Sequence, residues 1–172
     1  INTLGGAITG GQFAATNAIA TINVSGSSID YTTLGSEIDR FDDFRNDPDI
    51  ATFNLADTTT VTLGSQAEVD NFLSDVNAGL VSVAGANQAV TVTPAPGGVD
   101  ISHTDANSLA TKAGGTVTAT IVDTTTVDQL VTLRTPNGSD NEVNAYTITI
   151  KAADATGSTA AEFNTINSAT SV

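Results

Sequence analysis

Short runs in which threonine alternates with small aliphatic residues constrain the fold of this chain more than any other feature of its sequence. In Thr116–Asp123 the side chains of Val117, Ala119 and Ile121 share one face and threonines occupy the other, and Ala145–Lys151 repeats this arrangement. A period of two is typical of β-strands that bury one face and leave the other to solvent. Similar runs are Ala20–Val24, Thr60–Leu63, Val81–Val83 and Ala89–Thr93. The sequence therefore predicts several short strands with a threonine-rich outer face.

Between these runs lie helical patterns, of which Ser65–Leu80 is the clearest. Ser65 and Glu68 form a capping-box pattern, and apolar residues then recur at helical spacing until the chain reaches Gly79. The apolar set is Val69, Phe72, Leu73, Val76 and Leu80. This spacing predicts a helix that begins at Ser65 and ends at or near Gly79.

Other helical patterns are shorter. In Thr159–Ile166, Thr159 and Glu162 form a second capping box, and the spacing predicts that Phe163 and Ile166 are buried. The remaining patterns are Ser36–Phe44, Asp105–Ala113 with Asp105 as its cap, and Thr125–Leu133. Because helices and strands interleave along the chain, the predicted fold class is mixed α/β (α+β).

Proline, glycine and polar residues interrupt the pattern at Thr93–Gly98 and at Arg134–Asn141. We expect an N-terminal α+β region over residues 1–93, a Pro/Gly linker or turn over 94–98, and a strand–helix repeat region over 99–172. The two regions either stand apart or pack as one domain. The chain begins at Ile1, so we also expect a processed product or a segment of a longer protein.

Composition excludes several classes of function. The 172 residues include no cysteine, methionine or tryptophan, and 19 acidic residues against 5 basic ones give a net charge of -14. Without cysteine there is no disulfide scaffold, cysteine zinc site or thiol nucleophile. The five cations are scattered, so no basic stripe neutralises phosphates, and the acidic surface repels an anionic membrane. We therefore expect no nucleic acid and no direct membrane insertion.

From Val99 onward one theme occurs three times: an alternating strand, a hydroxyl or acidic cap, and a short helix. The passes are Val99–Thr104 with Asp105–Ala113, Thr116–Asp123 with Thr125–Leu133, and Ala145–Lys151 with Thr159–Ile166. One strand and one helix cannot bury their apolar faces alone, so we expect the passes to stack into a continuous core. Their unequal spacing makes this a degenerate repeat.

Two stretches of the repeat carry a resemblance. GTVTATIVDTTTVDQLVTL and NAYTITIKAADATGSTAAEFNTINSAT resemble the strand–helix repeats of large Thr/Ala/Asp-rich surface proteins of cyanobacteria and marine bacteria, and of virion structural proteins of their phages. The resemblance covers the C-terminal part of the chain, and the insertion Arg134–Val143 departs from the pattern. It implies an extracellular structural or adhesive role and supplies no catalytic residue.

One acidic cluster is a candidate calcium site. Its members are Asp39, Asp42, Asp43, Asp47 and Asp49. The first three have helical spacing and share one face, and the turn that follows brings further oxygens, the ligand that Ca²⁺ prefers. No EF-hand loop or glycine–aspartate nonapeptide is present. The alternative is therefore a solvated acidic face, partly offset by Arg40 and Arg45.

The remaining motifs point away from catalysis. His103 lies beside Ser102, but in a strand the two side chains face opposite sides and do not form a triad with Asp105. The glycine pairs lack the lysine and hydroxyl residue of a phosphate loop. Thr-x-Thr spacing, as in Thr116–Thr120, also occurs on flat ice-binding faces, but these need regular stacked coils, which the sequence does not predict. We expect no catalytic residue and no cofactor other than Ca²⁺.

These observations favour a non-enzymatic structural or assembly protein displayed on the exterior of a cell or virion, as a surface-layer, adhesin-like or capsid-decoration module. Its expected partners are copies of itself or neighbouring surface or capsid proteins. Ala145–Lys151 is a candidate edge strand for such pairing, although Lys151 discourages it. The alternative is a glycan- or receptor-binding module that uses the loops Thr93–Gly98 and Arg134–Val143. A hydrolase using Asp42 with Asp47 lacks a spacing signature.

Overall fold

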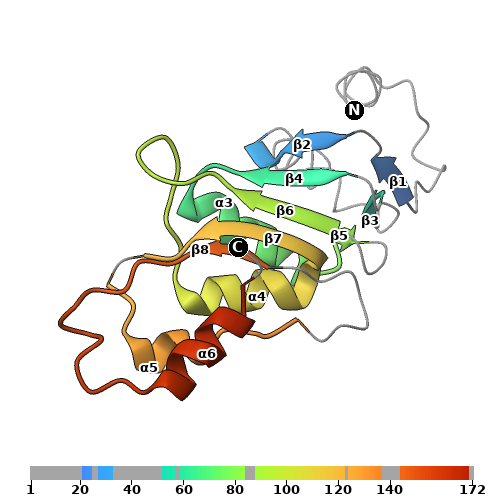
Figure 1. The fold of residues 1–172 in the computed structure, drawn as a ribbon. Helices are drawn as coiled ribbons and strands as arrows, with labels where there is room; N and C mark the ends of the chain where they lie inside the picture. Colours follow the sequence, from blue (N-terminus) through green and yellow to red (C-terminus); the bar gives the residue numbers. More distant parts are fainter. Residues whose placement is uncertain are drawn as a thin grey trace, which may run out of the picture.

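A computed structural model describes residues 21–24, 27–32, 52–56, 59–83, 88–122, 124–136 and 144–170. These residues form two parallel sheets, and three of the four described helices lie between two strands along the chain (Figure 1). The mixed α/β prediction is therefore confirmed. No helix in the described ranges is long and apolar enough to cross a membrane.

Strands that follow one another along the chain alternate between the two sheets from β1 to β6. The first contains, in order, β1 (Thr21–Val24), β3 (Thr52–Leu55) and β5 (Val81–Val83). The second contains, in order, β2 (Ser28–Asp30), β4 (Thr60–Leu63), β6 (Gln88–Val92), β7 (Gly114–Thr120) and β8 (Ala145–Thr147). Each of the first three passes adds one strand to each sheet, and the last two strands extend the second sheet alone. Sequence analysis located stacked passes only after Val99, whereas the stacking begins at β1 and β2.

The strands of the larger sheet pair in parallel, and the register between β6 and β7 shifts once, between Gln88 and Val90. Beyond that shift, one row of side chains runs across neighbouring strands. Val61 pairs with Val90, which pairs with Val117, and all three are fully buried. On the opposite face Thr62 pairs with Thr91, which pairs with Thr118. The alternation predicted from the sequence thus separates an apolar inner face from a threonine-rich outer face.

The helices are α3 (Gln66–Asn77), α4 (His103–Ala113), α5 (Val127–Leu130) and α6 (Ala160–Ser168). Helix α3 contacts β4 and β5, α4 contacts β6 and β7, and the two helices contact each other (Figure 1). Buried residues of α3 and α4 cover the apolar side of the sheets: Val69, Phe72, Ala106, Leu109, Ala110 and Ala113. This layer of helices builds the core.

The predicted start of the first of these helices is confirmed, with one difference in its cap. The Ser65 hydroxyl accepts a hydrogen bond from the Glu68 N–H at 3.3 Å. The Glu68 carboxylate accepts instead from the Gly64 N–H at 2.6 Å, one residue before the position that a capping box requires. Helix α3 ends at Asn77, and Gly79 then takes a positive φ of 75°.

For the first predicted pass of the repeat, Val99–Thr104 with Asp105–Ala113, both the predicted strand and the predicted helix cap are wrong. Residues 99–102 form no strand; Ile101 makes only an isolated parallel bridge to Ile121. Ser102, rather than Asp105, caps α4, because its hydroxyl accepts from the Asp105 N–H at 3.1 Å. A serine cap brings the helix start forward to His103.

Two later predictions were too long, and one helix cannot be placed. The predicted helix Thr125–Leu133 contains only the four-residue α5, capped by Thr126. The predicted strand Ala145–Lys151 contains only β8, which ends at Thr147. The predicted helix Ser36–Phe44 lies outside the described residues.

Residues 94–98 form a tight loop between β6 and α4. The Val99 N–H donates to the Thr93 carbonyl at 2.7 Å, which closes the loop. A Cβ at Gly98 would lie 2.0 Å from that same carbonyl oxygen. Strands from both sides of this loop, β6 and β7, pair directly in one sheet.

Candidate functional site

The acidic calcium candidate lies in a part of the chain that the structure does not describe. Its residues are Asp39, Asp42, Asp43, Asp47 and Asp49. Calcium binding there stays a prediction. Among the residues that the structure does describe, no three His, Cys, Asp or Glu side chains come together as a metal site.

His103 and its neighbours lie at the start of α4. The Ser102 hydroxyl accepts from the Asp105 N–H and donates to the Asp105 carboxylate at 2.8 Å. The same carboxylate accepts from the Gln66 side chain at 3.2 Å, which links the starts of α3 and α4. Ser102 and Asp105 are therefore engaged in capping and in helix–helix contact.

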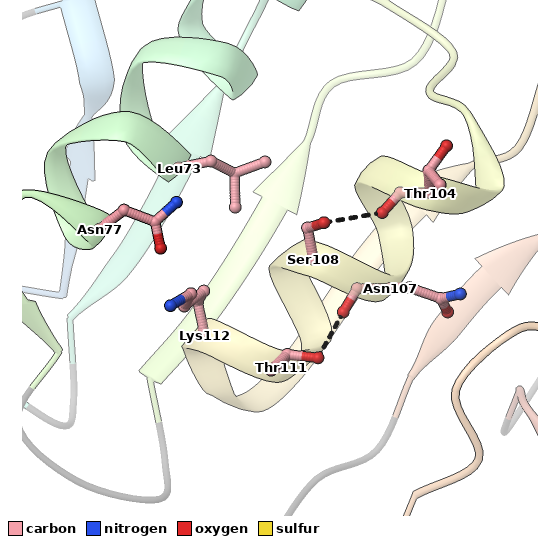
Figure 2. Close-up of a pocket in the computed structure, with 7 residues that line it drawn as sticks. All are labelled: Leu73, Asn77, Thr104, Asn107, Ser108, Thr111 and Lys112. Carbon is pink, nitrogen blue, oxygen red and sulfur yellow. Dashed lines mark hydrogen bonds between the residues drawn. The ribbon is translucent and has the colours of Figure 1, made fainter.

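A groove of about 340 Å³ lies at the surface between α3 and α4 (Figure 2). Leu73 and Asn77 line it from α3, and Thr104, Asn107, Ser108, Thr111 and Lys112 line it from α4. The hydroxyls of Ser108 and Thr111 donate to the carbonyls one turn earlier, at 2.9 and 2.8 Å (Figure 2). Asn107 donates to the Thr132 carbonyl and accepts from the Arg134 N–H. The side chains of Asn107, Ser108 and Thr111 are therefore engaged in hydrogen bonds within the fold.

A second groove, of about 330 Å³, lies where α5 and α6 begin, and its charged side chains are Asp128, Asp154 and Glu162. The Glu162 carboxylate accepts from the Thr159 N–H at 2.6 Å and from the Thr159 hydroxyl at 2.9 Å. These hydrogen bonds, led by the one from the backbone, hold the pKa of Glu162 below its ordinary value. The predicted capping box is confirmed, and it occupies the carboxylate.

The third groove, which we call the terminal groove, lies between β8 and α6 and has a volume of about 400 Å³. It is lined by Tyr146, Thr147, Ile148, Ile150, Phe163, Ile166, Asn167 and Thr170. No charged side chain lines it, whereas the other two grooves contain a lysine or several carboxylates. Phe163, at its rim, is 37% exposed, and Ile166 is 5% exposed. The predicted burial is therefore right for Ile166 and wrong for Phe163.

Phe163 is exposed because of where α6 lies. Helix α4 packs against both α3 and the sheet, whereas the main contact of α6 with another described helix is with α5. The spacing of apolar residues predicts which face of a helix turns inward, but not whether a neighbour covers that face. The terminal groove is the part of this face that remains open.

One hydroxyl closes the hydrogen-bonding edge of β8, the last strand of the larger sheet. The Thr147 carbonyl accepts from the Ile121 N–H and so faces β7; the N–H and carbonyl of Tyr146 consequently face the open edge. There the Tyr146 N–H donates to the Thr170 hydroxyl at 2.9 Å, and this hydroxyl lies 3.3 and 3.2 Å from the carbonyl oxygens of Asn144 and Tyr146.

Sequence reasoning missed this role of Thr170. It predicted that Lys151 discourages pairing of the edge, but β8 ends at Thr147, four residues before Lys151. A threonine that follows a helix gives no sequence signal of reaching back to the preceding strand. The contact depends on how α6 returns to the sheet.

The outer face of the larger sheet carries threonines in rows across neighbouring strands. One row is Thr62, Thr91 and Thr118; in another, Thr120 pairs with Thr147. Thr118 and Thr147 are exposed, and the other three are half-buried. Each row spans only two or three strands, and the first ends where Thr118 pairs with Ala145.

Comparisons with known proteins give no match to a family model, a curated protein or a solved structure. The resemblance to bacterial surface and phage virion repeats stays a prediction. The functional interpretation consequently depends on the geometry of the grooves, the β8 edge and the threonine rows.

Proposed function

We propose that this chain is a non-enzymatic structural module displayed on the exterior of a cell or virion, where it assembles with copies of itself or with neighbouring surface or capsid proteins. The observation that carries the proposal is the parallel stacking of strands from β2 to β8, with helices on the apolar side. Repeated passes of this kind build an extended surface rather than a single enclosed pocket.

The polar side chains of the described grooves support the same proposal. The hydroxyls between α3 and α4 bond to their own helices, and Glu162 bonds to the cap of α6. A catalytic group needs its polar atom directed at a substrate, within hydrogen-bond reach. The net charge of -14 keeps such a protein dispersed and confines close contact between copies to uncharged surface.

Immunogold electron microscopy of the native source tests this function. We expect an antibody raised against the folded chain to label intact cells or particles on their outer surface, in a lattice, a decoration or an appendage. Cells permeabilised before labelling are the control. Label that appears only after permeabilisation contradicts the proposal.

The alternative of a glycan- or receptor-binding module has no supporting observation in the described residues. Sugar-binding sites commonly present aromatic rings, but Tyr31, Phe53, Phe72 and Tyr146 are all buried. Phe163 is exposed, but it lies at the terminal groove rather than in the loop Thr93–Gly98. Residues 137–143 of the second predicted loop, Arg134–Val143, lie outside the described residues. A glycan array tests this alternative, and binding above background would support it.

A second candidate function follows from the threonine rows. Strands in a sheet lie about 4.8 Å apart and alternate residues of one strand roughly 6.6 Å apart, so the paired rows form a regular two-dimensional array of hydroxyl and methyl groups. Such an array orders water in a fixed pattern, which favours binding to ice. The observation that favours it is the register of Thr62, Thr91 and Thr118.

Growth of ice crystals in a solution of the protein tests this second candidate. We expect recrystallisation to slow, and we expect Thr118→Tyr to abolish the effect because Thr118 is exposed within the array. Thr111→Tyr on α4, a threonine that is likewise exposed but lies outside the array, is the matched control. Unchanged ice growth with the wild-type protein rules this function out.

A further inference from the structure

The chain returns to the edge of its own last strand directly after α6. The N–H and carbonyl of Tyr146 point away from β7, and the Thr170 hydroxyl accepts from that N–H at 2.9 Å. The same hydroxyl lies 3.3 and 3.2 Å from the carbonyl oxygens of Asn144 and Tyr146. A further strand of the sheet would need these backbone groups as its own partners. Thr170 must therefore leave before β8 pairs with another strand on this side.

One side chain is enough at this edge because β8 is short. The strand contains only Ala145–Thr147, so Tyr146 is its one residue whose backbone groups point away from β7. A longer strand would present several such residues, beyond the reach of one hydroxyl. Short edge strands and covered edges are two ways in which proteins prevent unwanted strand pairing. The edge of β8 combines both.

Helix α6 holds Thr170 in place. Ile166 and Ala169 are buried, and the N–H groups of Ala169 and Thr170 donate to the carbonyls of Ile166 and Asn167. Within α6 itself Ile166 is the one buried residue, so less apolar surface holds this helix than holds α4. Elements with few buried apolar contacts open most readily. We therefore expect the end of α6 to leave the sheet before the strands of the sheet separate.

We propose that Thr170 is an edge guard, by which we mean that its hydroxyl keeps other strands from pairing with β8 while the end of α6 is docked. Undocking of Thr170 exposes the backbone groups of Tyr146 and allows an extended strand to add to the sheet. The contact is autoinhibitory, because α6 belongs to the same chain as the edge that it covers. The guard stands independently of the exterior display proposed above, because it decides which edge is closed rather than where the protein lies.

Charge is a second barrier to strand pairing between copies of the chain. The net charge of -14 makes two copies repel each other. At about 1 M salt the Debye length falls to about 3 Å, so this repulsion is screened. At low salt the repulsion opposes pairing whether or not the hydroxyl is present, so the effect of the hydroxyl on pairing is measured at high salt.

Three variants isolate the hydroxyl of the guard. Thr170→Val removes the hydroxyl and keeps the branched shape of the side chain. Thr165→Val is the matched control, because Thr165 is an exposed threonine of α6 whose hydroxyl donates within the helix, to the Ala161 carbonyl at 3.0 Å. Thr170→Ser keeps the hydroxyl, so we expect it to behave as the wild type does. Circular dichroism confirms that the variants are folded.

Two measurements on the full chain test the guard. Amide exchange of Tyr146, followed by NMR and corrected for the intrinsic rate, reports the local contact. We expect the protection of this amide to fall about fivefold or more in Thr170→Val, as for the loss of one hydrogen bond. Sedimentation velocity over a concentration series at about 1 M salt reports pairing. We expect Thr170→Val to associate at lower concentrations than the wild type and Thr165→Val.

The guard is supported if Thr170→Val alone loses Tyr146 protection and associates, and if the protection returns in the associated form, where an added strand accepts from the Tyr146 N–H. Unchanged protection in Thr170→Val would show that the hydroxyl does not hold the edge. Loss of protection without association would show that the exposed edge takes no further strand. Either result overturns the guard, as does an equal effect of Thr165→Val.

Discussion

Helices α4 and α6 begin with the same local design but differ in how deeply they are buried. Ser102 caps α4 with Asp105 in its first turn, and Thr159 caps α6 with Glu162 in its first turn. Helix α4 buries Ala106, Leu109, Ala110 and Ala113 completely or nearly so, whereas α6 buries only Ile166.

The difference follows from the number of neighbours. Helix α4 contacts α3 on one side and β6 and β7 beneath it, and the Tyr146 hydroxyl donates to its Ala106 carbonyl at 3.2 Å. Helix α6 contacts α5 and lies beside the last strand of the sheet. Capping is therefore a local event, while burial, from which a short helix takes most of its stability, is conferred by the passes on either side. We call these two parts the central pass and the terminal pass.

We expect the largest difference between the two passes when one apolar side chain in each is truncated and the free energy of unfolding is compared. Leu109→Ala in the central pass removes a fully buried side chain, so we expect the free energy of unfolding to fall by about 2–5 kcal/mol. Phe163→Ala in the terminal pass removes a larger side chain, but because it is 37% exposed we expect a loss of about 1 kcal/mol or less. Urea denaturation of both variants measures the contrast. Equal losses would show that the two passes are covered alike.

An intermediate effect concerns the loop that leads into the central pass. Gly98→Ala places a Cβ 2.0 Å from the Thr93 carbonyl oxygen, so we expect the backbone to shift and the free energy of unfolding to fall by about 1–3 kcal/mol. Gly97→Ala is the matched control, because a Cβ at Gly97 would meet no atom within 4 Å, and its effect should stay within about 0.5 kcal/mol. A Gly98→Ala variant as stable as the wild type would mean that the loop is not tightly fixed.

The smallest effect is the response of the terminal pass to acid. The pKa of Glu162 is lower in the folded chain than in the unfolded chain, mainly because of the hydrogen bond from the Thr159 N–H. The ionised carboxylate therefore stabilises the fold fully at pH values above the pKa of the unfolded chain. This stabilisation is lost as the pH falls through the pKa of the folded chain. We expect the protection of the α6 amides, relative to their intrinsic exchange rate at each pH, to fall below about pH 4.3, the ordinary value for glutamate, with little change in α4.

Glu162→Gln is the control for this response, because it keeps an acceptor for the Thr159 N–H but does not titrate. Hydrogen exchange followed by mass spectrometry measures the two helices separately. If α6 in the Glu162→Gln variant responds to acid as the wild type does, the cap carboxylate is not the cause.

Prediction from sequence succeeded where the signal was local. The Ser65 start of α3, the capping box of Thr159 and Glu162, and the strand over Thr60–Leu63 were all predicted correctly. It failed where a contact between distant residues decided the structure. Val99–Thr104 alternates like a strand, but only Ile101 finds a partner, and the Ser102 cap turns the chain into α4.

The candidate site was predictable only in part. The apolar spacing correctly identified Ile166 as an inward-facing residue, and the alternation correctly separated threonines from valines in the sheet. The exposure of Phe163 and the closure of the β8 edge by Thr170 had no sequence signal, because each depends on the position of α6 relative to β8.

The sequence by itself determined the alternation of the strands and the caps of the helices, because these depend on backbone geometry and on side chains a few residues apart. Only the tertiary structure decided that the strands stack in parallel from β1 and β2 onward, and that among the described elements the last pass has a neighbouring pass on one side only. The physical reason is that strand pairing and burial depend on contacts between residues about thirty positions apart, such as Thr62 and Thr91. Local periodicity carries no information about which of these distant residues pair.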